Sequence, residues 1–137
     1  MAYNRAFTAL ALPALLLTSC MQEPKVEVTR KGAAIEIDVT RQGATEPPCV
    51  KSLTVSIEGA DIAETEPVWE LSTAQPGRCA SSFVYGQVPA GYAQARAAPL
   101  LATGKKYLVE VSGPGLLGGA TFTARAQDGT LTDKPAS

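Results

Sequence analysis

The chain contains no histidine among its 137 residues. This absence removes the Ser–His and Cys–His nucleophile pairs, imidazole ligands for zinc and the side chain that most often serves as a general base. The sequence also lacks a Ser-x-x-Lys motif, so the serine–lysine acyl-enzyme arrangement is missing. We therefore expect a protein that is not an enzyme, carries no cofactor and binds no metal.

No apolar run in the chain reaches the length of a membrane-spanning helix. Met1–Arg5 carries one positive side chain, and Ala6–Leu17 is uncharged and almost wholly apolar. This second stretch, of about twelve residues, has the length of the apolar part of a secretory signal peptide. A membrane-spanning helix needs about twenty such residues. We expect residues 1–19 to be a signal peptide and no permanent transmembrane helix to follow.

The signal segment ends in Leu17–Cys20, with the sequence Leu-Thr-Ser-Cys. This ending resembles the lipobox of bacterial lipoprotein precursors. The resemblance implies cleavage before Cys20, acylation of Cys20 by fatty acids such as palmitate, and a short lipidated tether over residues 20–24. Acyl chains hold a protein at a membrane by about 0.8 kcal/mol per buried methylene. Enteric lipoproteins kept at the inner membrane have Asp after the cysteine, where this chain has Met21, so the resemblance favours the outer membrane.

Neither sign of charge dominates the chain. Twelve Lys and Arg residues face thirteen Asp and Glu residues, and removal of the signal peptide takes Arg5 from the basic set. A nucleic-acid-binding protein usually shows a basic patch or stripe, which this sequence lacks. We expect no nucleic-acid partner and no electrostatic membrane role beyond the lipid. An envelope protein or a glycan is the expected partner.

Cysteine is scarce, at three residues. With Cys20 acylated, Cys49 and Cys79 remain as an even pair in an oxidising compartment. We predict a disulfide between them that ties loops or strand ends, and the alternative is two reduced buried thiols. Closing a loop of about thirty residues stabilises a fold by roughly 3–4 kcal/mol in the chain-entropy model. Two cysteines without a histidine make a poor metal site.

Sustained helical periodicity is missing after the signal segment, whereas apolar and polar residues alternate repeatedly. Such alternation, broken by Gly- and Pro-rich turns, is typical of half-buried strands. About seven short strands within residues 25–132 predict an all-β domain, an antiparallel β-sandwich. Pro89–Leu100 is predicted to be a long loop and residues 133–137 a flexible tail. The clearest expected strands are Ile35–Val39, Leu53–Ile57, Tyr107–Val111 and Thr121–Ala126.

The segment Leu101–Val111 resembles the Leu-x-Pro-Gly-x-x-Tyr-x-Val-x-Val signature of fibronectin type III domains. Leu101, Gly104 and Tyr107 keep its spacing, and a threonine replaces the proline. The resemblance implies a fibronectin type III or immunoglobulin-like sandwich with a tyrosine corner, in which the Tyr107 hydroxyl bonds to backbone a few residues upstream. In immunoglobulin domains the second cysteine follows this tyrosine by two residues. Val109 stands there, so the predicted disulfide is not the usual inter-sheet bridge.

Two further stretches, Val68–Leu71 and Phe83–Tyr92, resemble the layout of small lipoproteins of Gram-negative bacteria. This resemblance implies a fold and a location in the cell envelope, and it assigns no site residues. Within the second stretch, Tyr85 and Tyr92 border a Gly- and Pro-rich loop. We therefore predict a binding surface here, at which an aromatic ring stacks on a sugar or holds a peptide. The alternative is that Tyr85 lies in the core and Tyr92 staples the loop.

The chain has one acidic cluster, formed by Asp61, Glu64, Glu66 and Glu70. Two carboxylates at a suitable separation hydrolyse glycosidic bonds. The spacing lacks the repeated Asp pattern of a calcium loop, and a solvated loop is the simplest interpretation. We predict a lipid-anchored envelope protein that acts as a non-catalytic binding or assembly module. The alternatives are a cell-wall-active hydrolase that uses the acidic loop, and a hydrolase inhibitor.

Overall fold

The computed structural model of the protein describes residues 23–59, 66–126 and 128–129. The expected signal peptide, Cys20 and the expected tail lie outside these ranges. Every regular element among the described residues is a β-strand, so the expected all-β class is confirmed. The same residues form no helix long and apolar enough to cross a membrane. The strands are β1 (Pro24–Lys31), β2 (Ala34–Arg41), β3 (Ser52–Ile57), β4 (Trp69–Thr73), β5 (Ser82–Val84), β6 (Tyr92–Arg96), β7 (Lys106–Gly113) and β8 (Leu116–Thr123).

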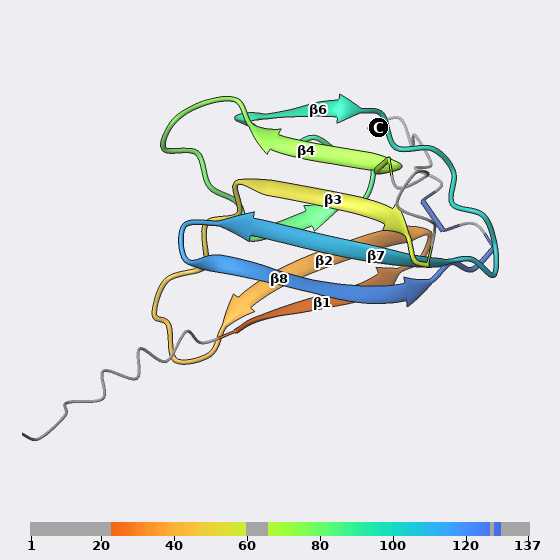
Figure 1. The fold of residues 1–137 in the computed structure, drawn as a ribbon, viewed down its shortest axis with the longest axis horizontal. Helices are drawn as coiled ribbons and strands as arrows, with labels where there is room; N and C mark the ends of the chain where they lie inside the picture. The colour runs from red at the N-terminus through yellow and green to blue at the C-terminus, as the bar shows by residue number, and fades with distance from the viewer. Residues whose placement is uncertain (1–22, 60–65, 127, 130–137) are drawn as a thin grey trace, which may run out of the picture.

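The strands form two antiparallel sheets that lie face to face (Figure 1). One sheet has the order β1-β2-β5 and the other the order β6-β4-β3-β7-β8. Every described strand pair is antiparallel, as expected for a sandwich. The described residues form eight strands where about seven were expected.

Strand β6 corrects the prediction of a long loop over Pro89–Leu100. Only Tyr92, its first residue, is buried, and the four residues after it are exposed. Its sequence therefore lacks the alternation that reveals a half-buried strand. Pairing with β4 holds β6 at the edge of the five-stranded sheet, with a bulge opposite Glu70 and Leu71.

Strand β8 begins at Leu116, before the predicted start at Thr121. Gly118 and Gly119 lie inside the strand, and β1 passes close to Gly118. A Cβ atom on Gly118 would lie 2.8 Å from Cγ of Pro24. Gly118 therefore permits a close approach of β1 to β8 that any larger residue would obstruct.

One hydrophobic core fills the space between the sheets. The three-stranded sheet contributes Ile35, Ile37 and Phe83, and the five-stranded sheet contributes Leu53 and Trp69, all at most 2% exposed. Aromatic pairs join the two layers: the ring of Trp69 lies 5.1 Å from that of Tyr85, edge to face. Trp69 is thus a core residue.

Three connections carry the chain between the sheets, and the first two lie at the same end of the molecule (Figure 1). Residues 42–51 join β2 to β3, residues 74–81 join β4 to β5, and residues 85–91 join β5 to β6. With the β7–β8 turn at Pro114 and Gly115, the first two connections form what we call the disulfide end. The opposite end, here the far end, includes the β1–β2 turn and the β6–β7 connection, residues 97–105.

Candidate functional site

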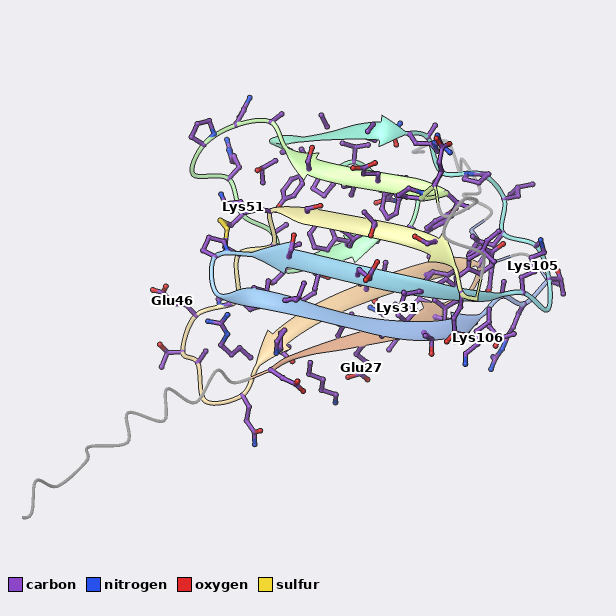
Figure 2. All side chains as sticks on the ribbon, viewed as in Figure 1. Glu27, Lys31, Glu46, Lys51, Lys105 and Lys106 are labelled. Atoms are coloured by element: carbon purple, nitrogen blue, oxygen red, sulfur yellow. A yellow bond between two sulfur atoms is a disulfide. The ribbon has the colours of Figure 1, made fainter. Side chains whose placement is uncertain are left out.

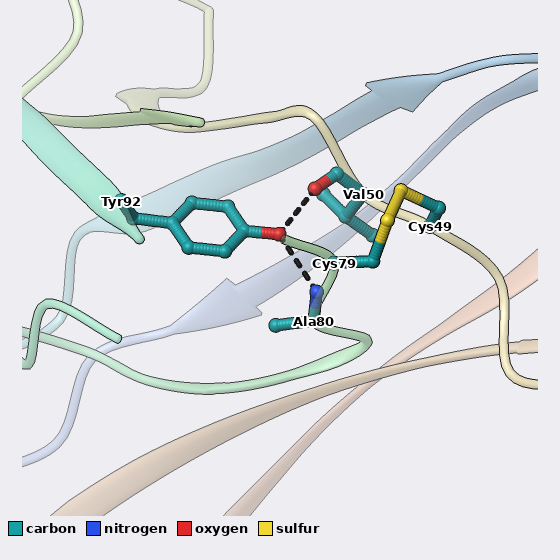
Figure 3. The surroundings of a disulfide bond; sticks show 5 residues. All are labelled: Cys49, Val50, Cys79, Ala80 and Tyr92. Atoms are coloured by element: carbon teal, nitrogen blue, oxygen red, sulfur yellow. Dashed lines mark hydrogen bonds between the residues drawn. A yellow bond between two sulfur atoms is a disulfide. The ribbon is translucent and has the colours of Figure 1, made fainter. Parts of the chain in front are cut away.

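A disulfide joins Cys49 to Cys79 and gives the disulfide end its name (Figure 3). The two Cα atoms lie 4.8 Å apart. The next residues in each chain segment pair as well, because the Val50 N–H donates a 3.1 Å hydrogen bond to the Ala80 carbonyl. The disulfide therefore links the β2–β3 connection to the β4–β5 connection, rather than two core strands.

Tyr92 supports this linkage from inside the core (Figure 3). Its hydroxyl accepts a 2.8 Å hydrogen bond from the Ala80 N–H and donates to the Val50 carbonyl. Burial raises the pKa of Tyr92, and the bond from Ala80 partly offsets the rise. The side chain is 7% exposed, and its hydroxyl is satisfied internally.

Tyr85 is more deeply placed, at 1% exposure. Its hydroxyl donates a 2.7 Å hydrogen bond to the Pro99 carbonyl and so holds the β6–β7 connection. Burial raises the pKa of Tyr85 far above its ordinary value, and neighbouring Tyr107 adds to the rise. The prediction of a binding surface at Tyr85 and Tyr92 is therefore wrong, because both rings fill the core and both hydroxyls bond to backbone.

Tyr107 lies at the start of β7 and fastens the turn before it. The Ala102 N–H donates a 2.9 Å hydrogen bond to the Tyr107 hydroxyl, five residues upstream of the tyrosine. Gly104 has φ of +83°, a conformation that residues with a Cβ rarely adopt. Leu101 is buried against the core. This is the geometry of a tyrosine corner at the predicted residues.

The acidic cluster is only partly described, since Asp61 and Glu64 lie outside the described ranges. Glu66 binds Arg96, with 2.6 Å between its Oε2 and the Arg96 Nη2. Glu70 stands on β4 opposite Thr54 of β3 and Arg96 of β6. The described residues contain no group of three potential metal ligands. In the described part of the cluster, Glu66 is thus engaged in an ion pair at the surface.

One partly buried ion pair was not predicted. Arg30 of β1 donates from Nε to both carboxylate oxygens of Asp128, at 3.2 and 3.1 Å. Asp128 is 4% exposed and also accepts a 2.7 Å hydrogen bond from the Arg125 N–H. The pair fastens β1 to the segment after β8. Sequence patterns do not reveal it, because the two partners lie 98 positions apart in the sequence.

Two hollows flank the loop of residues 44–48 at the disulfide end. The smaller, of about 300 Å³, includes Arg41, and the larger, of about 450 Å³, includes Cys79. The Arg41 Nη2 donates a 2.7 Å hydrogen bond to the Gly115 carbonyl on the β7–β8 turn. The Arg41 Nε is buried and has no hydrogen-bond partner among the described residues. The hollow that includes Arg41 was not predicted from the sequence, because its lining residues come from three separate segments. The segments shared by both hollows contribute Glu46, Pro47, Pro48 and Ser81.

The two edges of the five-stranded sheet differ. At one edge, β8 is covered by β1, whose Pro24 and Val26 lie against Gly118. At the other edge, no described strand pairs with the outer side of β6. The residues Ala93–Arg96 of β6 are exposed. This edge offers backbone donors and acceptors to an added strand.

Comparison with protein-family models, with curated proteins and with solved structures finds no match to this chain.

Proposed function

We propose that this protein is a lipid-anchored envelope protein whose fibronectin type III or immunoglobulin-like domain binds a protein partner and catalyses no reaction. The resemblance of Leu17–Cys20 to a lipobox supports the anchor. The order of the strands supports the type of domain. The sheet β1-β2-β5 corresponds to strands A, B and E, and β4-β3-β7-β8 corresponds to strands C′, C, F and G. Tyr107 then stands near the start of strand F, where the tyrosine corner belongs.

The exposed outer edge of β6 carries the binding part of this proposal. An extended partner segment adds to such an edge through main-chain hydrogen bonds, and side-chain pockets supply the specificity. Ala93 and Ala95 present small side chains, so a second backbone meets little steric obstruction there. The rest of the sheet edge is unsuitable, because β1 covers β8.

Photocrosslinking in intact cells tests the edge. A benzoyl-phenylalanine in place of Ala95 on β6 is expected to yield a discrete crosslinked partner. The same residue in place of Thr121, exposed on β8 of the same sheet, is the matched control and is expected to yield none. Equal adducts at both positions, or none at Ala95, would contradict binding at the β6 edge.

Mass spectrometry of the mature protein tests the anchor separately. The N-terminal peptide is expected to begin at Cys20 and to carry acyl chains. A free amine on a residue other than Cys20, with no added lipid mass, would refute the anchor. Binding at the β6 edge would then be tested by the photocrosslinking result alone.

A further inference from the structure

We propose that the disulfide end rests on the membrane surface and that Arg41 binds the phosphate of a lipid headgroup. This inference relies on the proposed attachment at Cys20, and it adds the face of the domain that touches the bilayer. The overall charge is nearly balanced, so net charge alone does not draw the molecule to an anionic surface. The orientation instead follows from the length of the tether, the position of β1, and the side chains of Arg41 and Leu117.

The tether is very short. Three residues separate Cys20 from Pro24, where β1 begins. A chain covers at most about 3.6 Å per residue, so Pro24 stays within roughly 14 Å of the acylated residue. The end of the domain that contains Pro24 must therefore lie near the lipid headgroups.

Pro24 belongs to the disulfide end. It pairs with Arg41, the last residue of β2, and it packs against Gly118 of β8. The eight residues of β1 run from there to the far end. At about 3.4 Å per residue this strand is roughly 27 Å long, so the far end is held away from the bilayer. Figure 2 shows Glu46 and Lys51 at the disulfide end and Lys105 and Lys106 at the far end.

Arg41 supplies the chemistry for a phosphate. Its Nη2 binds the Gly115 carbonyl in a solvent-exposed hydrogen bond, so this end of the guanidinium is open to a headgroup, whereas its Nε is buried. Arg41 lines the hollow of about 300 Å³, together with the hydroxyl-bearing residues Thr40 and Thr45. Guanidinium groups bind phosphate oxygens through charge-assisted hydrogen bonds. Glu46 lines the same hollow and opposes an anion, although its side chain is exposed to solvent, which weakens the repulsion.

Leu117 adds an apolar contact at the same end. It follows the β7–β8 turn and is 78% exposed. An exposed leucine beside the headgroups gains free energy by entering the interface. The far end offers a matched residue, Leu100, which is 70% exposed in the β6–β7 connection.

Fluorescence quenching by nitroxide-labelled lipids tests the orientation. Leu117→Cys and Leu100→Cys each add one reactive thiol, because Cys49 and Cys79 are joined and Cys20 is acylated in the proposal. The labelled, lipidated proteins are placed in vesicles of phosphatidylethanolamine and phosphatidylglycerol. The label at position 117 is expected to be quenched at least twice as strongly as the label at position 100. Equal or reversed quenching overturns the orientation.

Substitution of Arg41 tests the headgroup contact. Arg41→Gln is expected to reduce quenching of the label at position 117 at least two-fold, and Lys105→Gln at the far end is the matched control without effect. Because Arg41 also binds Gly115, thermal unfolding is measured for each variant, and Arg41→Lys, which keeps a charge, is expected to give intermediate quenching. Quenching that is unchanged in both Arg41 variants overturns the headgroup contact.

Flotation with the vesicles separates this inference from the proposed anchor. A protein that floats but shows equal quenching of the two labels disproves the orientation and leaves the anchor intact. A protein that carries no lipid and does not float disproves the anchor and the orientation together.

Discussion

Three buried tyrosine hydroxyls fix loops to the core. Tyr85 holds Pro99, Tyr92 holds the pair Val50–Ala80, and Tyr107 holds Ala102. The last of these was predictable, because its partner lies five residues away within a recognisable motif. The other two were not, because a sequence does not show which backbone group a core tyrosine will meet across the fold. Tyr85 and Tyr92 were therefore assigned to a surface that they do not form.

Stability should fall in alkaline solution because of these tyrosines. Burial raises the pKa of Tyr85 and of Tyr92 above the ordinary value of 10.0. Above about pH 10 the unfolded chain loses these protons while the folded protein keeps them, so stability is complete below pH 10 and declines as pH rises further. The loss is at most about 1.4 kcal/mol per pH unit for each tyrosine. Urea unfolding at about pH 8 and about pH 11 measures it.

The Tyr85→Phe variant is the control for that pH dependence. It is expected to be less stable than the native chain near neutral pH, because the Pro99 carbonyl loses its donor. Its stability should also fall less steeply above pH 10. A slope identical to that of the native protein would show that Tyr85 does not cause the alkaline loss.

Removal of the Tyr107 hydroxyl should weaken the fold at the tyrosine corner. Tyr107→Phe leaves the Ala102 N–H without its acceptor, at a cost of about 1–3 kcal/mol. The urea midpoint should fall with an unchanged slope of the transition. Thr103→Ala, an exposed change in the same turn, serves as the control and should leave the midpoint nearly unchanged.

Whether a strand could be predicted depended on how regularly buried and exposed residues alternate along it. The central strands β2, β3 and β7 bury every second residue and were found from the sequence. The edge strand β6 buries only its first residue, so its sequence gives no periodic signal. The start of β8 was missed because glycine is a common turn residue, whereas here Gly118 makes room for β1. That requirement comes from another strand and is invisible in local sequence.

Gly118→Ala should expose this requirement. The added methyl would lie 2.8 Å from Pro24 Cγ and 3.3 Å from Val26 Cγ2, so one of the strands must shift. Overpacking of this kind costs about 1–3 kcal/mol. The loss is measured by chemical unfolding. Combining the change with Pro24→Ala removes the nearest atom and should recover part of the stability, and a purely additive double variant would argue against contact between β1 and β8.

At the scale of the whole molecule, the fold class followed from the sequence but the arrangement of the ends did not. The hollow that includes Arg41 draws residues from β2, the 44–48 loop and the segment before β5. No local pattern joins these segments, because their proximity depends on the sheet order. The prediction that Cys49 pairs with Cys79 required only a count of the cysteines and the expectation of an oxidising compartment.

Loss of that bond should destabilise the entire domain. Reduction, or the double change Cys49→Ser and Cys79→Ser, releases a loop spanning 30 residues and should cost about 3–4 kcal/mol. The far-ultraviolet circular dichroism should keep its β-sheet character, because the Val50–Ala80 pair and Tyr92 remain. Comparison of urea midpoints with and without reductant measures the loss. Coincident midpoints would show that the bond contributes little.

The position of this bond also governs how the domain would respond to mechanical load. A pull between an N-terminal anchor and a captured partner enters the domain through β1, whose hydrogen bonds to β2 run along its full length and are loaded in shear. Once those two strands give way, the extending chain meets Cys49, and tension passes directly through sulfur to Cys79. The 29 residues between them, about 100 Å of chain at full extension, are not extended, and strands β3 and β4 bear none of the force.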